Sequence, residues 1–402
     1  MTFLKIMKEN NTVMRKALFI ANGIWIDGKN PGISGGDVRW IEIAKEWQKI
    51  GFEIHVLTTR AGIELCKKLG LNAVFHRMKA QDSYFTFSYV NRALKSFSIP
   101  RELKRFSGII YVTTEHFYDV IPGAIIKRNN PNDLFVVVAH WVAPLIRKGT
   151  LITNSLLFYV NQRIGFRVAK KYADVILAVS EYTRCSIIKM LKIPGYKVVS
   201  VKCGIPYDEI RSVASKVKSK DIDGIFMKRF DGTKGVFDVV KIWRKVVKEI
   251  PNAKLVLVGH GPRSTLIKLK KLIGSLGLSK NVYIKGPIYD PRKKFLLLAT
   301  SKLFLLPSYE ENWAIVIGEA LAAGVPVICY RLPSIVPIWQ DKVVWVPKGD
   351  INTFAQLTIK LLKDGKYKVS LIDKGVKYVK KYSWSNIAKE ELEILLNVTK
   401  ER

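Results

Sequence analysis

The chain has 402 residues, of which 48% are hydrophobic and 25% are charged, and its formal net charge is +34 at pH 7. This length exceeds the size at which a single hydrophobic core stops growing, so we expect two domains, and the composition excludes a long disordered tract. No apolar run is long enough to cross a bilayer, because the most apolar stretch, residues 134–146, is short and contains His140.

The excess of basic residues predicts attraction to polyanions: nucleic acid, anionic lipid headgroups or phosphorylated substrates. The sequence has no basic helix, zinc module or RNP-like strand, so we expect no nucleic-acid partner. A lysine-rich solvated surface and a membrane-surface role both stay open as explanations of the charge. The first fifteen residues lack the apolar core of a secretory signal. We therefore expect a cytoplasmic protein, with the inner face of the cell membrane as a candidate peripheral location.

The four cysteines lie far apart in the chain and form no Cys-x2-Cys pair. No histidine stands at metal-ligand spacing from them, so we predict buried free thiols, with neither a disulfide nor a metal site. These residues are Cys66, Cys185, Cys203 and Cys329.

The chain opens with a β-loop-α unit. Residues 1–13 have no periodic pattern, and we expect them to be a poorly ordered extension. Residues 14–21 predict a buried strand, which is followed by a loop containing Gly35-Gly36. Apolar side chains at i, i+3, i+4 and i+7 within residues 40–47 then predict a helix, and a second strand is predicted at 53–58.

Strand and helix signals alternate through the rest of the chain. Such alternation predicts two parallel sheets, each covered on both faces by helices. The polar, Lys- and Ser-rich segment 206–219 is predicted to be the linker between them. The further strands expected in the first half are 108–112, 134–140, 175–179 and 198–201. Those expected in the second half are 224–227, 254–258, 282–285, 303–306, 325–329 and 343–346.

The most informative motif lies in residues 307–328. A short acidic loop containing Glu311 follows a strand and precedes a helix that ends near Gly324. The free N–H groups at this helix start could bind a diphosphate, while Glu311 and Glu319 accept hydrogen bonds from sugar hydroxyls. Acidic residues are also common near helix N-termini because they complement the dipole, so the spacing alone does not decide between these interpretations.

The segment resembles the Glu-x7-Glu motif of family 4 retaining glycosyltransferases. The resemblance implies that Glu311 contacts the donor sugar and that Glu319 contacts the donor ribose. The family commonly has Gly-Phe-Gly after the first Glu, whereas the donor-site residues here are Asn312, Trp313, Ala314 and Ile315. This departure leaves the identity of the donor sugar open.

A second element of the family is Gly-Arg-Leu followed by Lys-Gly after the first strand of the C-terminal domain. Residues 228–230 and Lys234-Gly235 are similar to it, with Lys228 in place of the usual Gly. The resemblance implies that Arg229 and Lys234 neutralise the donor diphosphate. In so basic a chain the alternative is a solvated surface pair, and only the position at a strand end favours the functional interpretation.

The first half carries weaker signals. Gly35 and Gly36 match the family's N-domain glycine loop, whose N–H groups approach the donor phosphate; a turn that needs positive φ is the alternative. His116 lies where many relatives place a histidine near the reacting anomeric carbon, and His140 competes for this role. By fold analogy, Gly286 is expected near the nucleobase.

The resemblance extends from Met14 to the C-terminus and implies an α/β fold of the GT-B type. In this fold, two Rossmann-like, doubly wound parallel-sheet domains face a cleft. The implied acceptor domain is residues 14–205 and the implied nucleotide-sugar domain is residues 206–383. A last helix, residues 384–402, crosses back to the N-domain.

The implied activity is a retaining, metal-independent transfer of a hexose from a UDP- or GDP-sugar to a hydroxyl of a glycan or polyprenyl-phosphate-linked acceptor. The nucleotide sugar is a co-substrate and no other cofactor is expected. The implied catalytic residues are His116, Arg229, Lys234 and Glu311. Other GT-B reactions, epimerisation or phosphorolysis, and a polyanion- or membrane-binding protein on an inactive GT-B scaffold stay as alternatives.

Interleaved aromatic and basic residues in the N-domain favour an anionic membrane surface and a lipid-linked acceptor. The alternative is that the aromatic rings lie in the core and the basic side chains are solvated. The residues concerned are Tyr84, Phe85, Phe87, Tyr89, Phe97 and Phe106, with Arg92, Lys95, Arg101, Lys104 and Arg105.

Overall fold

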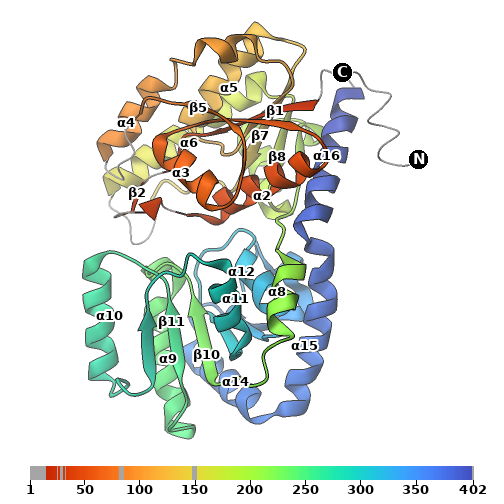
Figure 1. Cartoon of the computed structure of the whole chain (residues 1–402). Helices are drawn as coiled ribbons and strands as arrows, with labels where there is room; N and C mark the ends of the chain where they lie inside the picture. Colours follow the sequence, from red (N-terminus) through yellow and green to blue (C-terminus); the bar gives the residue numbers. More distant parts are fainter. Residues whose placement is uncertain are drawn as a thin grey trace. The chain divides into compact units, whose positions relative to one another are not determined.

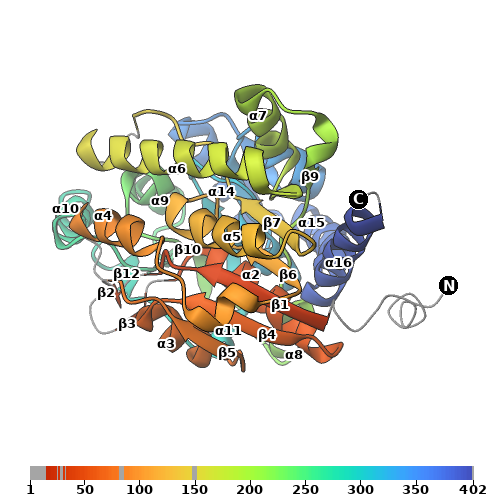
Figure 2. The ribbon, with the colours of Figure 1, turned by 90° about the horizontal axis from the view of Figure 1, so that it is seen from above.

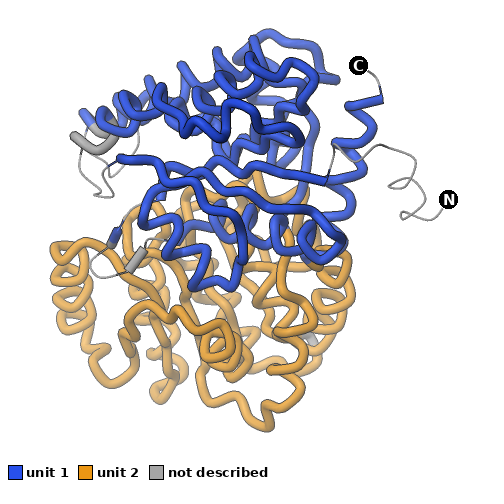
Figure 3. Tube along the Cα trace, turned by 45° about the horizontal axis from the view of Figure 1, so that its top comes forward, with its two compact units in different colours: residues 1–203, 384–402 blue, residues 204–383 orange. Residues whose placement is uncertain are grey.

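The computed structural model describes residues 15–24, 26–27, 30–31, 33–80, 86–146 and 152–400. The chain divides into two compact units, which are residues 1–203 with 384–402 and residues 204–383 (Figure 3). The first division falls after residue 203, where the sequence suggested 205. The predicted N-terminal extension, residues 1–13, lies outside the described residues.

Unit 1 is built on a seven-stranded parallel sheet with the order β5-β4-β1-β6-β7-β8-β9 (Figure 2). The strand order reverses between β1 and β6, which is where ligand loops gather in doubly wound sheets. Six of the strands were predicted to within two residues at each end. The exception, β5, has no continuous apolar run. The strands are β1 Lys16–Ala21, β4 Glu53–Thr58, β5 Val74–Arg77, β6 Ile109–Val112, β7 Leu134–Ala139, β8 Val175–Ala178 and β9 Val198–Ser200.

Helices cover both faces of this sheet. Helices α4, α5 and α6 lie on one face and α2 and α3 on the other, where α16 packs beside α2 (Figure 1). Helix α2 buries its predicted apolar face, with the rings of Trp40 and Trp47 lying 5.8 and 5.6 Å from that of Phe19. The helices are α2 Gly35–Lys49, α3 Arg60–Lys68, α4 Thr86–Lys95, α5 Phe117–Asn129, α6 Ile152–Tyr172, α7 Glu181–Leu191 and α16 Trp384–Lys400; β2 Ile26–Asp27 pairs with β3 Asn30–Pro31.

Unit 2 repeats the architecture with a six-stranded parallel sheet, in the order β12-β11-β10-β13-β14-β15. Its order reverses between β10 and β13. The strands follow the predicted ranges, shifted by at most two residues. They are β10 Ile222–Met227, β11 Leu255–Val258, β12 Val282–Lys285, β13 Ser301–Leu306, β14 Val327–Tyr330 and β15 Val344–Val346.

The predicted linker at residues 206–219 is wrong in part, because it contains helix α8. The side chain of Ile210 is fully buried, and the Arg211 guanidinium donates a hydrogen bond to the carbonyl of Ala322 at 3.1 Å. One buried apolar residue in a polar segment does not make the periodic pattern from which a helix is predicted. The helices of unit 2 are α8 Tyr207–Ala214, α9 Val236–Glu249, α10 Arg263–Ser275, α11 Pro291–Ala299, α12 Ile315–Ala322, α13 Val336–Trp339, α14 Ile351–Lys363 and α15 Gly365–Val379.

The last helix, α16, is held to unit 1 by a buried ion pair. The guanidinium of Arg39 on α2 pairs with Glu391 on α16, and both side chains are 1% exposed. The Tyr111 hydroxyl donates to the same carboxylate at 2.7 Å and accepts from Arg39 at 2.9 Å. The C-terminal helix therefore completes the N-terminal unit, as the resemblance implied.

The structure bears on two predictions about the chain as a whole, which concern membrane-spanning segments and cysteines. None of the described helices is both long and apolar enough to cross a membrane. All four cysteines are free, but the prediction that they are buried is wrong for Cys185. Cys185 is exposed on helix α7.

Candidate functional site

In unit 2 two loops meet where the strand order reverses. One loop follows β10 and the other follows β13. The two loops contact each other at Gly235, where the backbone of the first loop packs against Pro307 of the second. Gly235 has a φ of +75°, and a Cβ on it would lie 1.8 Å from the carbonyl oxygen of Pro307. Only glycine fits this position, which explains the Lys-Gly element.

The loop after β10 is folded by Asp231. Its carboxylate accepts hydrogen bonds from the backbone N–H groups of Thr233 at 2.9 Å and Lys234 at 3.1 Å. The same carboxylate accepts from the Arg229 Nε at 2.6 Å, and the Arg229 side chain is 48% exposed. Arg229 is therefore paired with its own loop.

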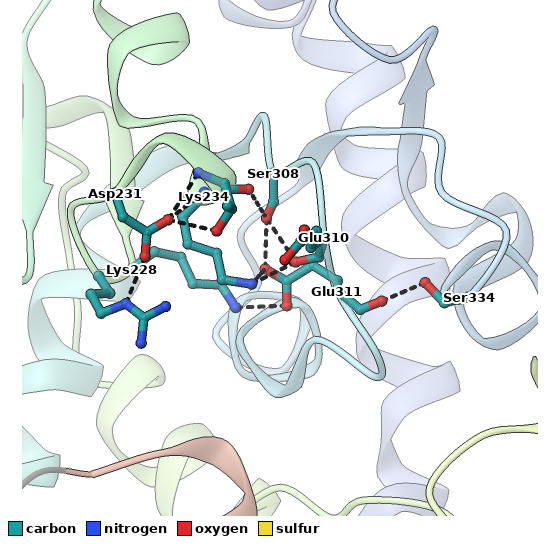
Figure 4. Close-up of polar contacts among 9 residues, drawn as sticks. Lys228, Asp231, Lys234, Ser308, Glu310, Glu311 and Ser334 are labelled. Atoms are coloured by element: carbon teal, nitrogen blue, oxygen red, sulfur yellow. Dashed lines mark hydrogen bonds and ion pairs between the residues drawn. The ribbon is translucent and has the colours of Figure 1, made fainter. Parts of the chain in front are cut away.

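Glu311 lies between two lysines (Figure 4). Its Oε2 is 2.9 Å from Lys228 Nζ, and its Oε1 is 3.4 Å from Lys234 Nζ. Ser308 donates to Oε1 at 2.9 Å, and Lys234 also donates to the carbonyl of Glu310 at 2.5 Å. Ser334 holds the loop by donating to the Glu311 carbonyl.

These contacts set the charge of the cluster. Burial opposes ionisation of Glu311, but the neighbouring Lys228 and Lys234 outweigh it and hold the pKa of Glu311 at about 2. Burial also lowers the pKa of Lys228, and Glu311 offsets part of that effect. Glu311 is thus a fixed carboxylate at neutral pH, flanked by two ammonium groups.

The residues between Glu311 and helix α12 serve the fold as well as the site. Trp313 is buried edge-to-face against Trp339, with ring centroids 4.7 Å apart, and its carbonyl accepts from the Trp339 Nε1 at 2.9 Å. Ala314 has φ +59° and precedes Ile315, the first residue of α12. The Trp313 side chain and carbonyl are therefore taken up by the packing of unit 2, whereas Asn312 is partly exposed.

Glu319, in helix α12, pairs with a cation that the motif did not predict. Lys294 on α11 lies 2.6 Å from Glu319 Oε1. Glu319 Oε2 is buried and has no hydrogen-bond partner within the described part of the chain. A buried carboxylate oxygen of this kind suits a hydroxyl donor from a ligand.

Gly286 follows strand β12. It is exposed, and a Cβ there would meet no atom within 4 Å. Its backbone therefore has no local requirement for glycine, and its assignment to the nucleobase stays a prediction.

In unit 1 the loops after β1, β6 and β7 also gather where the strand order reverses. Gly35 and Gly36 are the first residues of α2, and a Cβ on Gly36 would lie 2.9 Å from His140 Cε1. His140 Nε2 is 3.0 Å from the Thr113 carbonyl, so this nitrogen carries the proton. Burial, together with Arg39, lowers the pKa of His140 to about 4. His140 is therefore a neutral residue packed under the glycine loop.

His116, the other histidine candidate, precedes helix α5. Its ring stacks on Tyr118 at 5.3 Å and meets Phe158 edge-on at 4.6 Å. Its neighbour Glu115 is 1% exposed and accepts from the backbone N–H of His140 at 3.0 Å. Burial raises the pKa of Glu115 to about 7.

Known proteins match the chain in both units. Residues 208–378 match the family model described as Glycosyl transferases group 1, and residues 33–209 match the model described as Glycosyltransferase Family 4. The chain is a family 4-like group 1 glycosyltransferase.

Individual relatives agree with this assignment. The glycosyltransferase is 28% identical over 354 residues to the N-acetyl-alpha-D-glucosaminyl L-malate synthase of Bacillus anthracis, covering 83% of this chain and 86% of that one. It is 30% identical over 174 residues to the poly(glycerol-phosphate) alpha-glucosyltransferase of Bacillus subtilis, covering 42% and 25% of the two chains.

A solved structure supports the fold. The Anabaena protein HepE in complex with UDP and glucose matches with a TM-score of 0.74 at 17% identity, covering 94% of this chain and 98% of that one. The predicted GT-B fold, with two Rossmann-like parallel-sheet domains, is confirmed.

The sequence of this glycosyltransferase led to Glu311, Lys234 and Glu319 but not to all their partners. Lys294 gave no signal, because lysines are abundant throughout the chain. Lys228 stood out only as a departure from the family's glycine. Among the described residues, no group of three or more His, Cys, Asp or Glu side chains could hold a metal ion. The roles of the site residues in binding and catalysis stay predictions.

Proposed function

We propose that this glycosyltransferase is a retaining, metal-independent hexosyltransferase that uses a UDP- or GDP-sugar. The observation that carries the proposal is the cluster in unit 2, where the ammonium groups of three lysines pair with the carboxylates of Glu311 and Glu319 at the strand-order reversal. Such a set of charges matches a ligand that has both a diphosphate and several hydroxyl groups.

Three of these charges have a proposed partner on the donor. Lys234 contacts the diphosphate, Glu311 accepts a hydroxyl of the transferred sugar, and Glu319 accepts a ribose hydroxyl. The buried, unpartnered Oε2 of Glu319 supports the last assignment. In unit 1, His116 stays the candidate catalytic residue, and Gly35 and Gly36 stay the candidate donor-binding residues.

The names of relatives favour retention and a uridine nucleotide. The Bacillus anthracis and Bacillus subtilis proteins are named for α-linked products, and HepE was solved with UDP and glucose. The glucose of UDP-glucose is itself α-linked to phosphate, so an α-linked product retains the configuration. By analogy we propose the same outcome here.

In the proposed step, the bond between the anomeric carbon and the diphosphate oxygen breaks, and its electron pair leaves with the nucleoside diphosphate. The acceptor hydroxyl attacks from the same face, and its proton passes to the departing phosphate. Lys234 stabilises the negative charge that develops on the leaving group.

The test is a donor screen. The protein is incubated with UDP-, GDP- and ADP-sugars and a lipid extract, and the glycosylated product is identified by mass spectrometry. The expected result is one product with one donor, with nucleotide released only when acceptor is present. Nucleotide-sugar turnover without acceptor would instead indicate an epimerase or a hydrolase, and turnover that requires added inorganic phosphate would indicate a phosphorylase. No turnover with any donor would support the inactive polyanion-binding scaffold.

We further propose that the acceptor is lipid-linked and that unit 1 binds an anionic membrane surface. Helix α4 and the residues after it expose Leu94 at 67% and Phe97 at 59%. Helix α5 packs against both α4 and α6, and the start of α6 exposes Ile152 at 70%. Exposed apolar and basic side chains together suit a headgroup region.

The aromatic and basic residues named from the sequence divide into three groups. Phe106 and Arg92 are buried, so their predicted place on this surface is wrong. The exposed members are Phe97, Lys95, Arg101, Lys104 and Arg105. The members outside the described residues or side chains are Tyr84, Phe85, Phe87 and Tyr89.

Flotation with vesicles tests this surface. The protein should float with anionic vesicles at low salt and less at high salt, and a Leu94→Glu/Phe97→Glu variant should float less. Tyr196→Glu is the matched control, because Tyr196 is 82% exposed in the same unit but on another element. Equal recovery with neutral and anionic vesicles would end the membrane proposal.

A further inference from the structure

The cation next to Glu311 differs from the one that the family resemblance assigns to the diphosphate. The resemblance pairs Arg229 with Lys234. In the structure the Arg229 Nε donates to Asp231 at 2.6 Å, and its side chain is half exposed. Lys228 instead lies 2.9 Å from Glu311 and is 16% exposed. Lys228 and Lys234 therefore flank one carboxylate, and Arg229 does not contact it.

The charge of this cluster favours a further anion. Lys228 meets Oε2 of Glu311 and Lys234 meets Oε1. The two neighbouring carboxylates, Glu319 and Asp231, are each paired with a further cation, Lys294 and Arg229. The cluster thus keeps one positive charge in excess. Burial already lowers the pKa of Lys228, so a nearby phosphate would favour its charged form. Each ammonium has three N–H donors, and Glu311 takes one of those on Lys228.

The local geometry also limits what Arg229 can do. Asp231 is fixed by the turn, because its carboxylate caps the backbone of Thr233 and Lys234. The Arg229 Nε is committed to Asp231, which ties the guanidinium to its own loop and offsets its charge, so only its Nη groups are left for a diphosphate. Lys228, by contrast, already lies on the carboxylate that Lys234 contacts.

We propose that Lys228, rather than Arg229, is the second cation of the donor diphosphate site and contacts the diphosphate together with Lys234. The inference rests on the proposed function, because it needs a nucleoside-diphosphate donor. It makes Lys228, which stands where the family has glycine, a binding residue of this chain.

Calorimetric titration with UDP, GDP and ADP tests the inference. The tightest of these nucleotides is then compared across Lys228→Met, Lys234→Met and Arg229→Met, with thermal melting to verify folding. Loss of a charge-assisted contact should weaken binding about ten- to a hundredfold for the two lysine variants. Arg229→Met should weaken it less than about fivefold, as for an exposed ion pair. The matching nucleoside, which has no phosphate, should bind all variants alike.

A second pair of variants separates direct contact from neutralisation of Glu311. If Lys228 contacts the diphosphate, Lys228→Met should weaken binding by a similar factor in the Glu311→Gln background. If it only neutralises Glu311, the effect should vanish in that background. Lys228→Arg should restore most of the affinity, which a neutral substitution would not.

The outcomes are distinguishable. A large loss with Arg229→Met and none with Lys228→Met would overturn the inference while leaving the proposed function in place. A vanishing effect in the Glu311→Gln background would overturn direct contact. A wild-type protein that binds none of the three nucleotides would overturn the proposed function and the inference together.

Discussion

Ala314 occupies a backbone conformation that favours glycine. Its φ of +59° lies in the left-handed region, immediately before helix α12. The family commonly has glycine at this position, and the structure gives the reason: the chain must turn sharply between Glu311 and the helix. An alanine there retains the turn at a cost in backbone energy.

Ala314→Gly should therefore raise the free energy of unfolding of unit 2. The left-handed conformation costs a non-glycine residue about 1–2 kcal/mol, and glycine's greater freedom in the unfolded chain takes back about 0.4–1 kcal/mol. We expect a net gain of about 0.5–1 kcal/mol in urea unfolding. Ala320→Gly in the same helix is the control and should destabilise by about 1 kcal/mol. Equal destabilisation by both would contradict the strain argument.

Lys234→Ala should reduce the rate more than it weakens binding of the donor, whose diphosphate carries one negative charge fewer than that of the free nucleotide. The Lys234 ammonium contacts Glu311 and the carbonyl of Glu310, and by proposal the leaving diphosphate. Losing one preorganised contact to a developing charge should cost on the order of 3 kcal/mol in the transition state, about a hundredfold in kcat. Glu319→Ala should instead chiefly raise the donor KM. Steady-state kinetics with a saturable acceptor check both variants; an unchanged kcat/KM for Lys234→Ala would place the phosphate site elsewhere.

For single residues, the sequence predicted which residues belong to the candidate site better than which side chains contact one another. Glu311 and Lys234 were found because they stand in a motif that a strand end and a helix start bring together. The partner of Lys228 depends on which way a long side chain turns, and neither spacing nor periodicity encodes that. The pairing of Arg229 with Asp231 is likewise a loop conformation rather than a pattern.

Helix α16 shows how an element distant in sequence becomes part of unit 1. The Arg39 and Glu391 side chains are both 1% exposed, and each also bonds the Tyr111 hydroxyl. The Trp47 indole donates to the carbonyl of Ala388 at 3.1 Å. The ion pair is thus enclosed, and removing one partner leaves a buried charge unpaired.

Glu391→Ala should destabilise unit 1 by about 3–5 kcal/mol, because the Arg39 guanidinium would stay buried without its carboxylate. Glu390→Ala is the matched control one position earlier on the same helix. Its partner is Lys202, and both side chains are about half exposed. The control should change the free energy of unfolding by less than about 1 kcal/mol. Urea titration of both variants decides the point, and equal effects would show that the pair does not anchor the helix.

Most strands could be predicted because buried parallel strands are continuous apolar runs. Strand β5, at the edge of its sheet, has the pattern Val-Phe-His-Arg and exposes Val74. Helix α8 has one fully buried residue, Ile210, in a polar segment. Both elements were missed because tertiary contacts, rather than their own patterns, hold them in place.

Across the whole molecule, the two units should respond differently to pH. The length and the repeated strand-helix pattern predicted two units, but no sequence pattern indicated their buried carboxyl groups. In unit 1, burial raises the pKa of Glu115 from 4.5 to about 7 and that of Asp119 from 3.8 to about 7. In unit 2, the pKa of Glu311 lies at about 2, because Lys228 and Lys234 outweigh its burial.

The sign of each effect follows from which state binds the proton more tightly. Folded unit 1 holds protons on Glu115 and Asp119 that the unfolded chain has lost, so their stabilisation is full below pH 4 and is lost as the pH rises through 7. His140 acts in the opposite sense within this range, since its lowered pKa of about 4 weakens unit 1 as the pH falls below 6.5. Glu311 stabilises unit 2 above pH 4.5 and loses this effect only as the pH falls toward 2.

Raising the pH from 6.5 to 8 should therefore weaken unit 1. Unit 2 should instead gain slightly, because burial lowers the pKa of Lys220 to about 8 and the folded state loses this proton before the unfolded chain does. The two carboxyl groups should each lower the stability of unit 1 by about 1 kcal/mol over this range. Hydrogen exchange along urea titrations at both pH values measures it, with strands β6 and β7 reporting on unit 1 and β10 and β13 on unit 2. The Glu115→Gln variant has no proton to lose at this position, so the free energy of unfolding of unit 1 should fall by about half as much in this variant. A wild-type decline of equal size in both units would refute the assignment of the raised pKa values to unit 1.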